Sequence, residues 1–159
     1  MQPLTHWKRL LGSFVALLLI TALSLAWHWR MIAFGPVYAS GGVAINGYDP
    51  VAYFDENRPV AGRAELAYEH DGVTWLFSNP QRRERFSANP DRYLPQFGGY
   101  CAYAVGSGYS ARSDPAAFSI VENKLYLNFD LATREAWMQN AAALIEAGEQ
   151  NWPGVLLGH

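Results

Sequence analysis

The sequence contains a single cysteine, Cys101, in 159 residues. One cysteine excludes an internal disulfide, so the domain depends on its hydrophobic core for stability. A closed zinc site with several thiolate ligands is excluded for the same reason. A thiol-redox role would require a resolving thiol from a partner.

Histidine is almost as scarce. Of four histidines, His6, His28 and His159 lie near the ends of the chain, and His70 is the remaining one. The chain has no GxGxxG, P-loop, HExxH or CxxCH motif, which excludes the classical nucleotide, zinc-protease and c-type haem classes. A Ser-His-Asp hydrolase is disfavoured, because Ser78 has only His70 as a base. Enzymatic activity stays open, and a non-catalytic role is favoured.

Charged residues make up only 16% of the chain, and they are unevenly placed. The only charges before Pro36 are Lys8, Arg9 and Arg30. Nine basic and 14 acidic residues follow, a formal charge of −5. Because a polyanion repels an acidic body, the charge argues against nucleic-acid partners.

A long apolar run, Leu10–Trp27, contains no charged side chain. At about 1.5 Å per residue it reaches roughly 27 Å, close to the hydrocarbon thickness of a bilayer. The basic pair before it predicts cytoplasmic residues 1–9, a transmembrane signal anchor at residues 10–29 and an exported body. The alternative is a signal peptide cleaved after a small residue such as Ala26 or Ala39, and the sequence leaves this choice open.

The rest of the chain is expected to form a linker at residues 30–42 and one domain at residues 43–159. Asp49 is expected to cap a short helix that begins with Pro50. Segments 65–70 and 73–77 alternate in polarity around Asp71-Gly72, which predicts a β-hairpin.

Asparagine precedes proline at residues 79–80 and 89–90, a pattern that starts helices. The arginines of the first of these helices are expected to be solvated. Segments 118–121 and 125–129 predict a second hairpin with a loop at 122–124. A helix from Leu131 to about Gly148, capped by Asp130, is expected to bury a stripe that starts at Trp137. Two hairpins with flanking helices predict a small single domain of the α+β class, preceded by one transmembrane helix.

The stretch from Gly47 to Tyr93 resembles the YHS domain family, named for positions that correspond here to Tyr68, His70 and Ser78. Residues similar to those of the family surround them: Asp49-Pro50-Val51, Asp71-Gly72, Trp75, Phe77, Phe86, Asn89-Pro90 and Tyr93. A longer group of exported bacterial YHS proteins is similar up to Trp152 and includes the segment Gly98–Val105. Together with the predicted anchor, the resemblance implies a single-pass protein of the bacterial inner membrane with its C-terminal domain in the periplasm.

Metal handling, most often of copper, is the function that this resemblance implies. Related domains carry cysteines after the second strand of the hairpin, where this chain has Phe77-Ser78-Asn79. Cys101 is therefore the candidate thiolate ligand and His70 the candidate second ligand. The alternatives are a buried, inert cysteine and a histidine that bonds the adjacent backbone.

Three functions follow as hypotheses. The first is binding or handling of a transition metal such as copper. The second is a non-catalytic accessory subunit of a membrane protein complex, in which some of the many aromatic side chains form a partner surface. The third is a thiol-redox protein that uses Cys101. Ser78 is expected to support the start of a helix rather than act as a nucleophile.

Overall fold

The computed structural model describes residues 35–157. The predicted cytoplasmic residues 1–9 and the anchor at 10–29 lie outside this range, as do residues 158–159. Within the described range, no helix combines the length and the apolar character that crossing a bilayer requires.

Two β-sheets and five α-helices make up the described residues, which confirms the α+β class. The first sheet has the strand order β1 (Ala39–Ser40), β2 (Val43–Ala44), β4 (Val73–Phe77) and β3 (Arg63–His70). The second sheet pairs β5 (Asp114–Val121) with β6 (Lys124–Asn128). The helices are α2 (Ala52–Glu56), α3 (Pro80–Ala88), α4 (Ala102–Gly106), α5 (Leu131–Met138) and α6 (Ala141–Asn151). Short 3₁₀ turns are η1 (Ile45–Gly47), η2 (Pro90–Arg92), η3 (Gln96–Gly99) and η4 (Gly154–Leu157).

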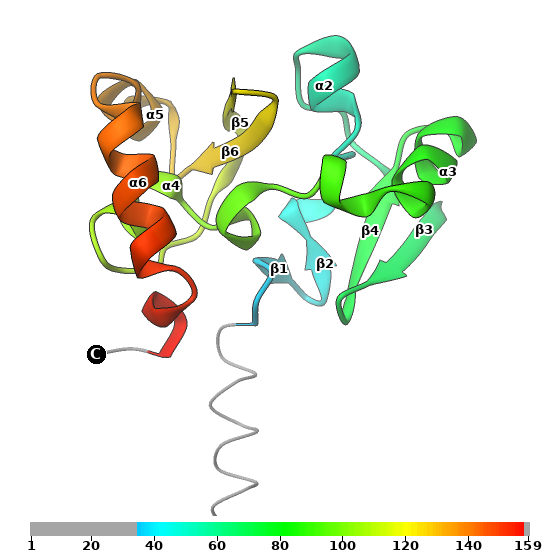
Figure 1. Ribbon diagram of the computed structural model, residues 1–159. Helices are drawn as coiled ribbons and strands as arrows, with labels where there is room; N and C mark the ends of the chain where they lie inside the picture. Colours follow the sequence, from blue (N-terminus) through cyan, green and yellow to red (C-terminus); the bar gives the residue numbers. More distant parts are fainter. Residues whose placement is uncertain (1–34, 158–159) are drawn as a thin grey trace, which may run out of the picture. The chain divides into compact units, whose positions relative to one another are not determined.

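The elements gather around the two sheets. Helix α3 lies beside β3 and β4, whereas α4 and α5 pack on β6 and α6 packs along α4 (Figure 1). The η3 turn lies between the first and the second sheet in the sequence, and it packs on β6. The segment that follows η3 therefore lies beside the second sheet.

Both predicted hairpins are present. Asp71 (φ 52°) and Gly72 (φ 74°) form the first turn, and Glu122 (φ 50°) and Asn123 (φ 60°) form the second. Two consecutive residues with positive φ match the twist of a two-residue hairpin. Lys124, expected in the loop, is the first residue of β6.

The folded unit begins earlier than the boundary expected at residue 43. Strand β1 lies inside the expected linker at 30–42 and pairs with β2. Val37 is buried in the core, and the Tyr38 amide donates to the Gly98 carbonyl. These contacts fix the chain well before Val43.

The single helix expected from Leu131 to about Gly148 is two helices, so that prediction was wrong. The Asp130 carboxylate caps α5 as expected, accepting from the Thr133 amide at 2.7 Å. Asn140 then leaves the helical region, with φ −143° and ψ 38°. The break lets α6 lie along α4, where a side chain on Gly106 would meet the Leu144 carbonyl.

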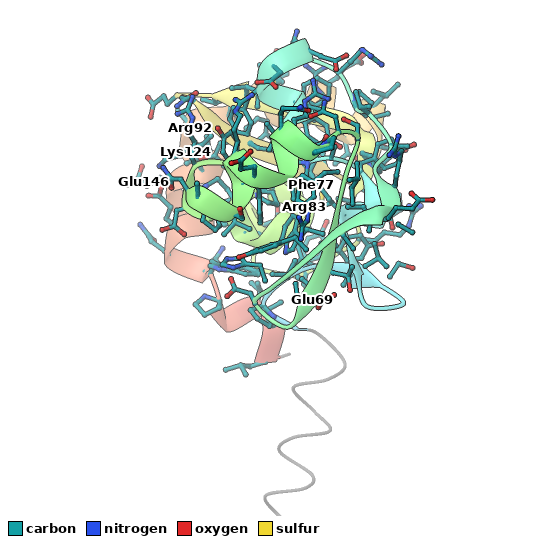
Figure 2. The ribbon with its side chains drawn as sticks, turned by 90° about the vertical axis from the view of Figure 1, so that its right-hand side faces the viewer. Glu69, Phe77, Arg83, Arg92, Lys124 and Glu146 are labelled. Atoms are coloured by element: carbon teal, nitrogen blue, oxygen red, sulfur yellow. The ribbon has the colours of Figure 1, made fainter. Side chains whose placement is uncertain are left out.

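Strand β6 joins two hydrophobic clusters. Leu125 and Leu127 are buried in the cluster that contains Trp75 and Phe77, whereas Tyr126 between them packs in the other cluster. Successive side chains of a strand point to opposite faces, so one strand can supply both clusters. Figure 2 labels Phe77, which is fully buried, and Arg83, which is exposed on α3.

Candidate functional site

Two glycines deliver Cys101 to its position. Gly98 (φ 58°) and Gly99 (φ 81°) follow Phe97 (φ 54°), a run of left-handed residues that only glycine adopts easily. A Cβ on Gly98 would lie 1.9 Å from the Pro36 carbonyl oxygen, and one on Gly99 would lie 2.9 Å from Ile45. The space that a side chain would occupy at these two glycines is therefore filled by other segments of the protein.

The Cys101 side chain is 1% exposed and lies just before α4. Its Sγ is 3.8 Å from Oδ1 of Asn128, which also accepts a hydrogen bond from the Tyr103 amide at 3.0 Å. The Asn128 amide nitrogen is buried, and it has no hydrogen-bond partner among residues 35–157. Cys101 therefore sits in a partly polar niche at the end of β6.

Burial raises the pKa of the Cys101 thiol above its ordinary value, because a thiolate loses hydration there. The backbone amides of Ala104, Phe129 and Tyr103 oppose this effect but do not overcome it. The thiol is therefore protonated at neutral pH. A protonated, buried thiol is a poor nucleophile.

Next to Cys101 lies a cleft of about 510 Å³ between the start of α4 and α5, which we call the Cys101 cleft. Apolar groups and hydroxyls form its lining: Cys101, Tyr103, Ala104, Tyr109, Ala111, Phe129, Ala132, Thr133 and Ala136. No Asp, Glu, Lys or Arg is among these lining residues. The cleft therefore suits a ligand with an apolar body.

Two exposed aromatic side chains border the cleft. Tyr109 is 53% exposed and Phe129 is 37% exposed. The Arg112 guanidinium lies over the Phe129 ring, 4.2 Å from its centroid. This cation–π contact holds one wall of the cleft in place.

His70 is part of a different environment, the aromatic cluster of the first sheet. Its ring stacks on Tyr68 and meets Phe86 edge-on, with centroids 6.5 and 5.8 Å away. Its Nε2 lies 3.5 Å from the Asp71 carboxylate, and its carbonyl accepts from the Trp75 indole. The His70 ring is therefore packed against the aromatic cluster beside the hairpin turn, and the expected bond from its imidazole to the adjacent backbone is not among its contacts within residues 35–157.

The structure does not bring the two candidate metal ligands together. Cys101 pairs with Leu127 beside the second sheet, whereas His70 is on β3 of the first sheet. Residues 35–157 contain no group of three or more His, Cys, Asp and Glu side chains arranged to hold a metal ion. A metal site that uses both residues stays a prediction from the sequence.

Ser78 belongs to a buried polar network. Its hydroxyl donates to the Asp49 carboxylate at 2.7 Å and accepts from Arg82 at 2.8 Å. Arg82 also pairs with Asp55 and Glu56 of α2. The expectation of a solvated Arg82 was wrong, because its guanidinium is buried between α2 and α3. The network is structural, and it confirms that Ser78 supports the start of a helix.

The residues that complete the Cys101 cleft were not expected from the sequence. Thr133 and Ala136 line the cleft from α5. For this helix the sequence pattern predicts only a stripe of buried core residues. Asn128 carried one usable signal, since it is a buried polar residue directly after the apolar run Leu125–Leu127.

Comparisons with known proteins return no relative: no family model, no curated protein and no solved structure matches the chain. The resemblance to YHS domains therefore stays a prediction from the sequence.

Proposed function

We propose that the chain is a non-catalytic binding module, an accessory subunit of a membrane protein complex that holds an apolar segment of its partner in the Cys101 cleft. In this proposal the YHS-like domain lies in the periplasm, and residues 10–29 anchor it in the bacterial inner membrane. The observation that carries the proposal is the cleft itself, which has apolar walls and exposed aromatic side chains at its edge.

The cleft has the size and composition of a binding pocket. Its volume of about 510 Å³ falls in the range of roughly 300–1,000 Å³ typical of ligand sites. Hot spots of protein interfaces are anchor side chains that fill such pockets, and aromatic residues are enriched around them. A Leu, Phe or Trp side chain of a partner matches these walls.

The contacts of Cys101 support binding rather than thiol chemistry. An activated thiol needs an adjacent base or a lowered pKa. The side chain next to Cys101 is the Asn128 amide, and burial raises the thiol pKa. Both observations disfavour the thiol-redox hypothesis.

Site-specific photo-crosslinking on the full chain in its native membrane tests the binding proposal. A photoreactive phenylalanine analogue is placed at Tyr109, with or without the second change Ala136→Glu. The matched control is Ala142→Glu, which makes the same change at an exposed position of α6 outside the cleft. We expect one discrete cross-linked species that Ala136→Glu abolishes, because a bound apolar segment would desolvate the new carboxylate.

Two results would contradict the proposal. One is a cross-linked species that survives Ala136→Glu as well as it survives Ala142→Glu. The other is a strictly monomeric protein after gentle detergent extraction and native electrophoresis.

Handling of Cu(I) is a second candidate, favoured by the position of the Cys101 thiol on the wall of the cleft. A soft metal can displace the thiol proton, and the three backbone amides near the sulfur would then stabilise the thiolate. His70 is not expected to be the second ligand, since it lies on the other sheet.

Copper uptake by the purified full chain tests this candidate. Cys101→Ala is expected to remove Cu(I) binding, whereas His70→Ala is expected to leave it unchanged. Failure of the wild-type chain to take up Cu(I), or unchanged uptake by Cys101→Ala, would rule the candidate out.

A further inference from the structure

A second pocket, distinct from the Cys101 cleft, lies between the first sheet and the end of α6. Its volume is about 360 Å³. Its walls come from distant parts of the chain: Trp75 of β4, Phe97 of η3 and Trp152 after α6. Two carboxylates, those of Asp71 and Glu149, also line it.

The aromatic walls are held by packing. The Phe97 and Trp152 rings are 6.2 Å apart between centroids, and Trp152 also packs on Tyr100 at 5.8 Å. The Trp75 indole N–H donates to the His70 carbonyl at 3.2 Å. These contacts preorganise the rings, which lowers the entropic cost of binding.

The two carboxylates come from different elements, Asp71 from the β3–β4 turn and Glu149 from α6. Asp71 lies 3.5 Å from the His70 ring nitrogen, and Glu149 lies 3.9 Å from the Lys124 ammonium. Neither distance is that of a good hydrogen bond, so both carboxylates keep capacity for a ligand.

We propose that this pocket binds a small organic ammonium ion, with the partly exposed Trp152 ring against its alkyl groups and the carboxylates of Asp71 and Glu149 near its charge. Trp75 and Phe97 are almost fully buried and back the Trp152 side of the pocket. Aromatic faces attract cations through the ring quadrupole, and this is how proteins recognise quaternary ammonium groups. The formal charge of −5 after Pro36 adds a long-range attraction for cations. The apolar walls favour an alkylated ammonium over a strongly hydrated inorganic cation.

The test uses choline and its neutral isostere 3,3-dimethyl-1-butanol on the full chain in a maltoside detergent, which carries no ammonium. The readout is the indole N–H resonance of Trp152, assigned by Trp152→Phe. Glu149→Gln and Asp71→Asn remove one carboxylate each. The matched control is Glu146→Gln, on an exposed position of the same helix outside the pocket (Figure 2).

We expect choline to shift the Trp152 resonance saturably and the isostere to leave it unshifted. Affinity should fall by about two- to fivefold in Glu149→Gln and in Asp71→Asn, as the loss of one exposed ion pair implies, and should be unchanged in Glu146→Gln. Equal binding of the isostere would overturn the proposal. So would the absence of a saturable shift, or equal losses in Glu149→Gln and Glu146→Gln.

A further arm separates the possible sources of the ammonium group. Glycerophosphocholine carries the phosphodiester of a lipid headgroup, whereas choline does not. Tighter binding of glycerophosphocholine would assign the pocket to a lipid headgroup, and tighter binding of choline would assign it to a free ammonium ion. These outcomes do not involve the Cys101 cleft, so the ammonium proposal stands or fails separately from the proposed function.

Discussion

Cys101 lies in the wall of the proposed binding cleft. The sequence identifies it as the only thiol, but its reactivity depends on neighbours that are distant in the chain. Asn128 lies beside its sulfur, and burial raises its pKa. Cys101 therefore has the surroundings of a buried side chain in the wall of a cleft rather than those of an activated nucleophile.

Alkylation of Cys101 tests its burial. At pH 7.5 iodoacetamide should modify the native thiol at least about tenfold more slowly than the thiol of the chain unfolded in guanidinium, because burial lowers both the thiolate fraction and access. Ser107→Cys in a Cys101→Ser background is the control, since position 107 is exposed. Equal rates for the two native thiols would show that Cys101 is accessible.

Asp55 is a single residue whose ion pairs stabilise the fold. Arg85 donates to both of its carboxylate oxygens, at 2.9 and 3.0 Å, and Arg82 donates at 3.1 Å. These hydrogen bonds, chiefly those from Arg85, hold the pKa of Asp55 below its ordinary value of 3.8. The carboxylate is therefore stabilised in the folded state relative to the unfolded state.

This lowered pKa predicts a defined pH dependence for Asp55→Asn. The stabilising contribution of Asp55 is fully present above pH 3.8 and is lost as the pH falls through the lower folded-state pKa. The variant should therefore be less stable than the wild type near neutral pH, and the gap should narrow below pH 3.8.

Urea unfolding at a series of pH values measures this gap. Glu135→Gln, an exposed change on α5, should show no comparable gap. A gap for Asp55→Asn that stays constant into strong acid would show that the ion pairs do not cause it.

At the scale of elements, local chemistry predicted the hairpins and caps well. Asp71-Gly72 turns the first hairpin, Asn79 caps α3 and Asp130 caps α5, all through contacts within a few residues. The break at Asn140 and the core position of β1 were not predictable in this way. They depend on packing against distant elements, such as Gly98 and α4.

The turn at Gly98 gives a prediction about these distant contacts. Gly98 and Gly72 both have positive φ, but only Gly98 has another segment against its Cα. Gly72→Ala should lower the free energy of unfolding by about 1 kcal/mol through backbone strain alone. Gly98→Ala should lower it by about 2–4 kcal/mol, because strain is joined by overlap with Pro36.

Denaturant unfolding of both variants measures the difference. Equal losses would mean that the segment around Pro36 moves away at little cost. Such a result would also weaken the second pocket, which Pro36 and Gly98 help to line.

At the scale of the whole domain, β6 couples the two hydrophobic clusters. Its alternating side chains enter one cluster through Leu125 and Leu127 and the other through Tyr126. Loss of the strand would expose both clusters at once. We therefore expect residues 35–157 to unfold as one cooperative unit.

Leu125→Ala tests this coupling. The change should lower the free energy of unfolding by about 2–5 kcal/mol, as for other buried leucines, while keeping a single transition. Leu131→Ala, at a 57% exposed position, should change it by no more than about 0.5 kcal/mol. Calorimetry and circular dichroism on the full chain would contradict the prediction if they resolved two separate domain transitions.

The sequence by itself determined what short-range chemistry controls: the α+β class, both hairpin turns, the caps of α3 and α5, and the structural role of Ser78. These features depend on backbone preferences and on hydrogen bonds between nearby residues. The separation of His70 from Cys101, the burial of Arg82, the break at Asn140 and the two pockets were decided by the tertiary structure alone. Each joins segments far apart in the chain, and their meeting depends on packing of the whole core rather than on any local pattern.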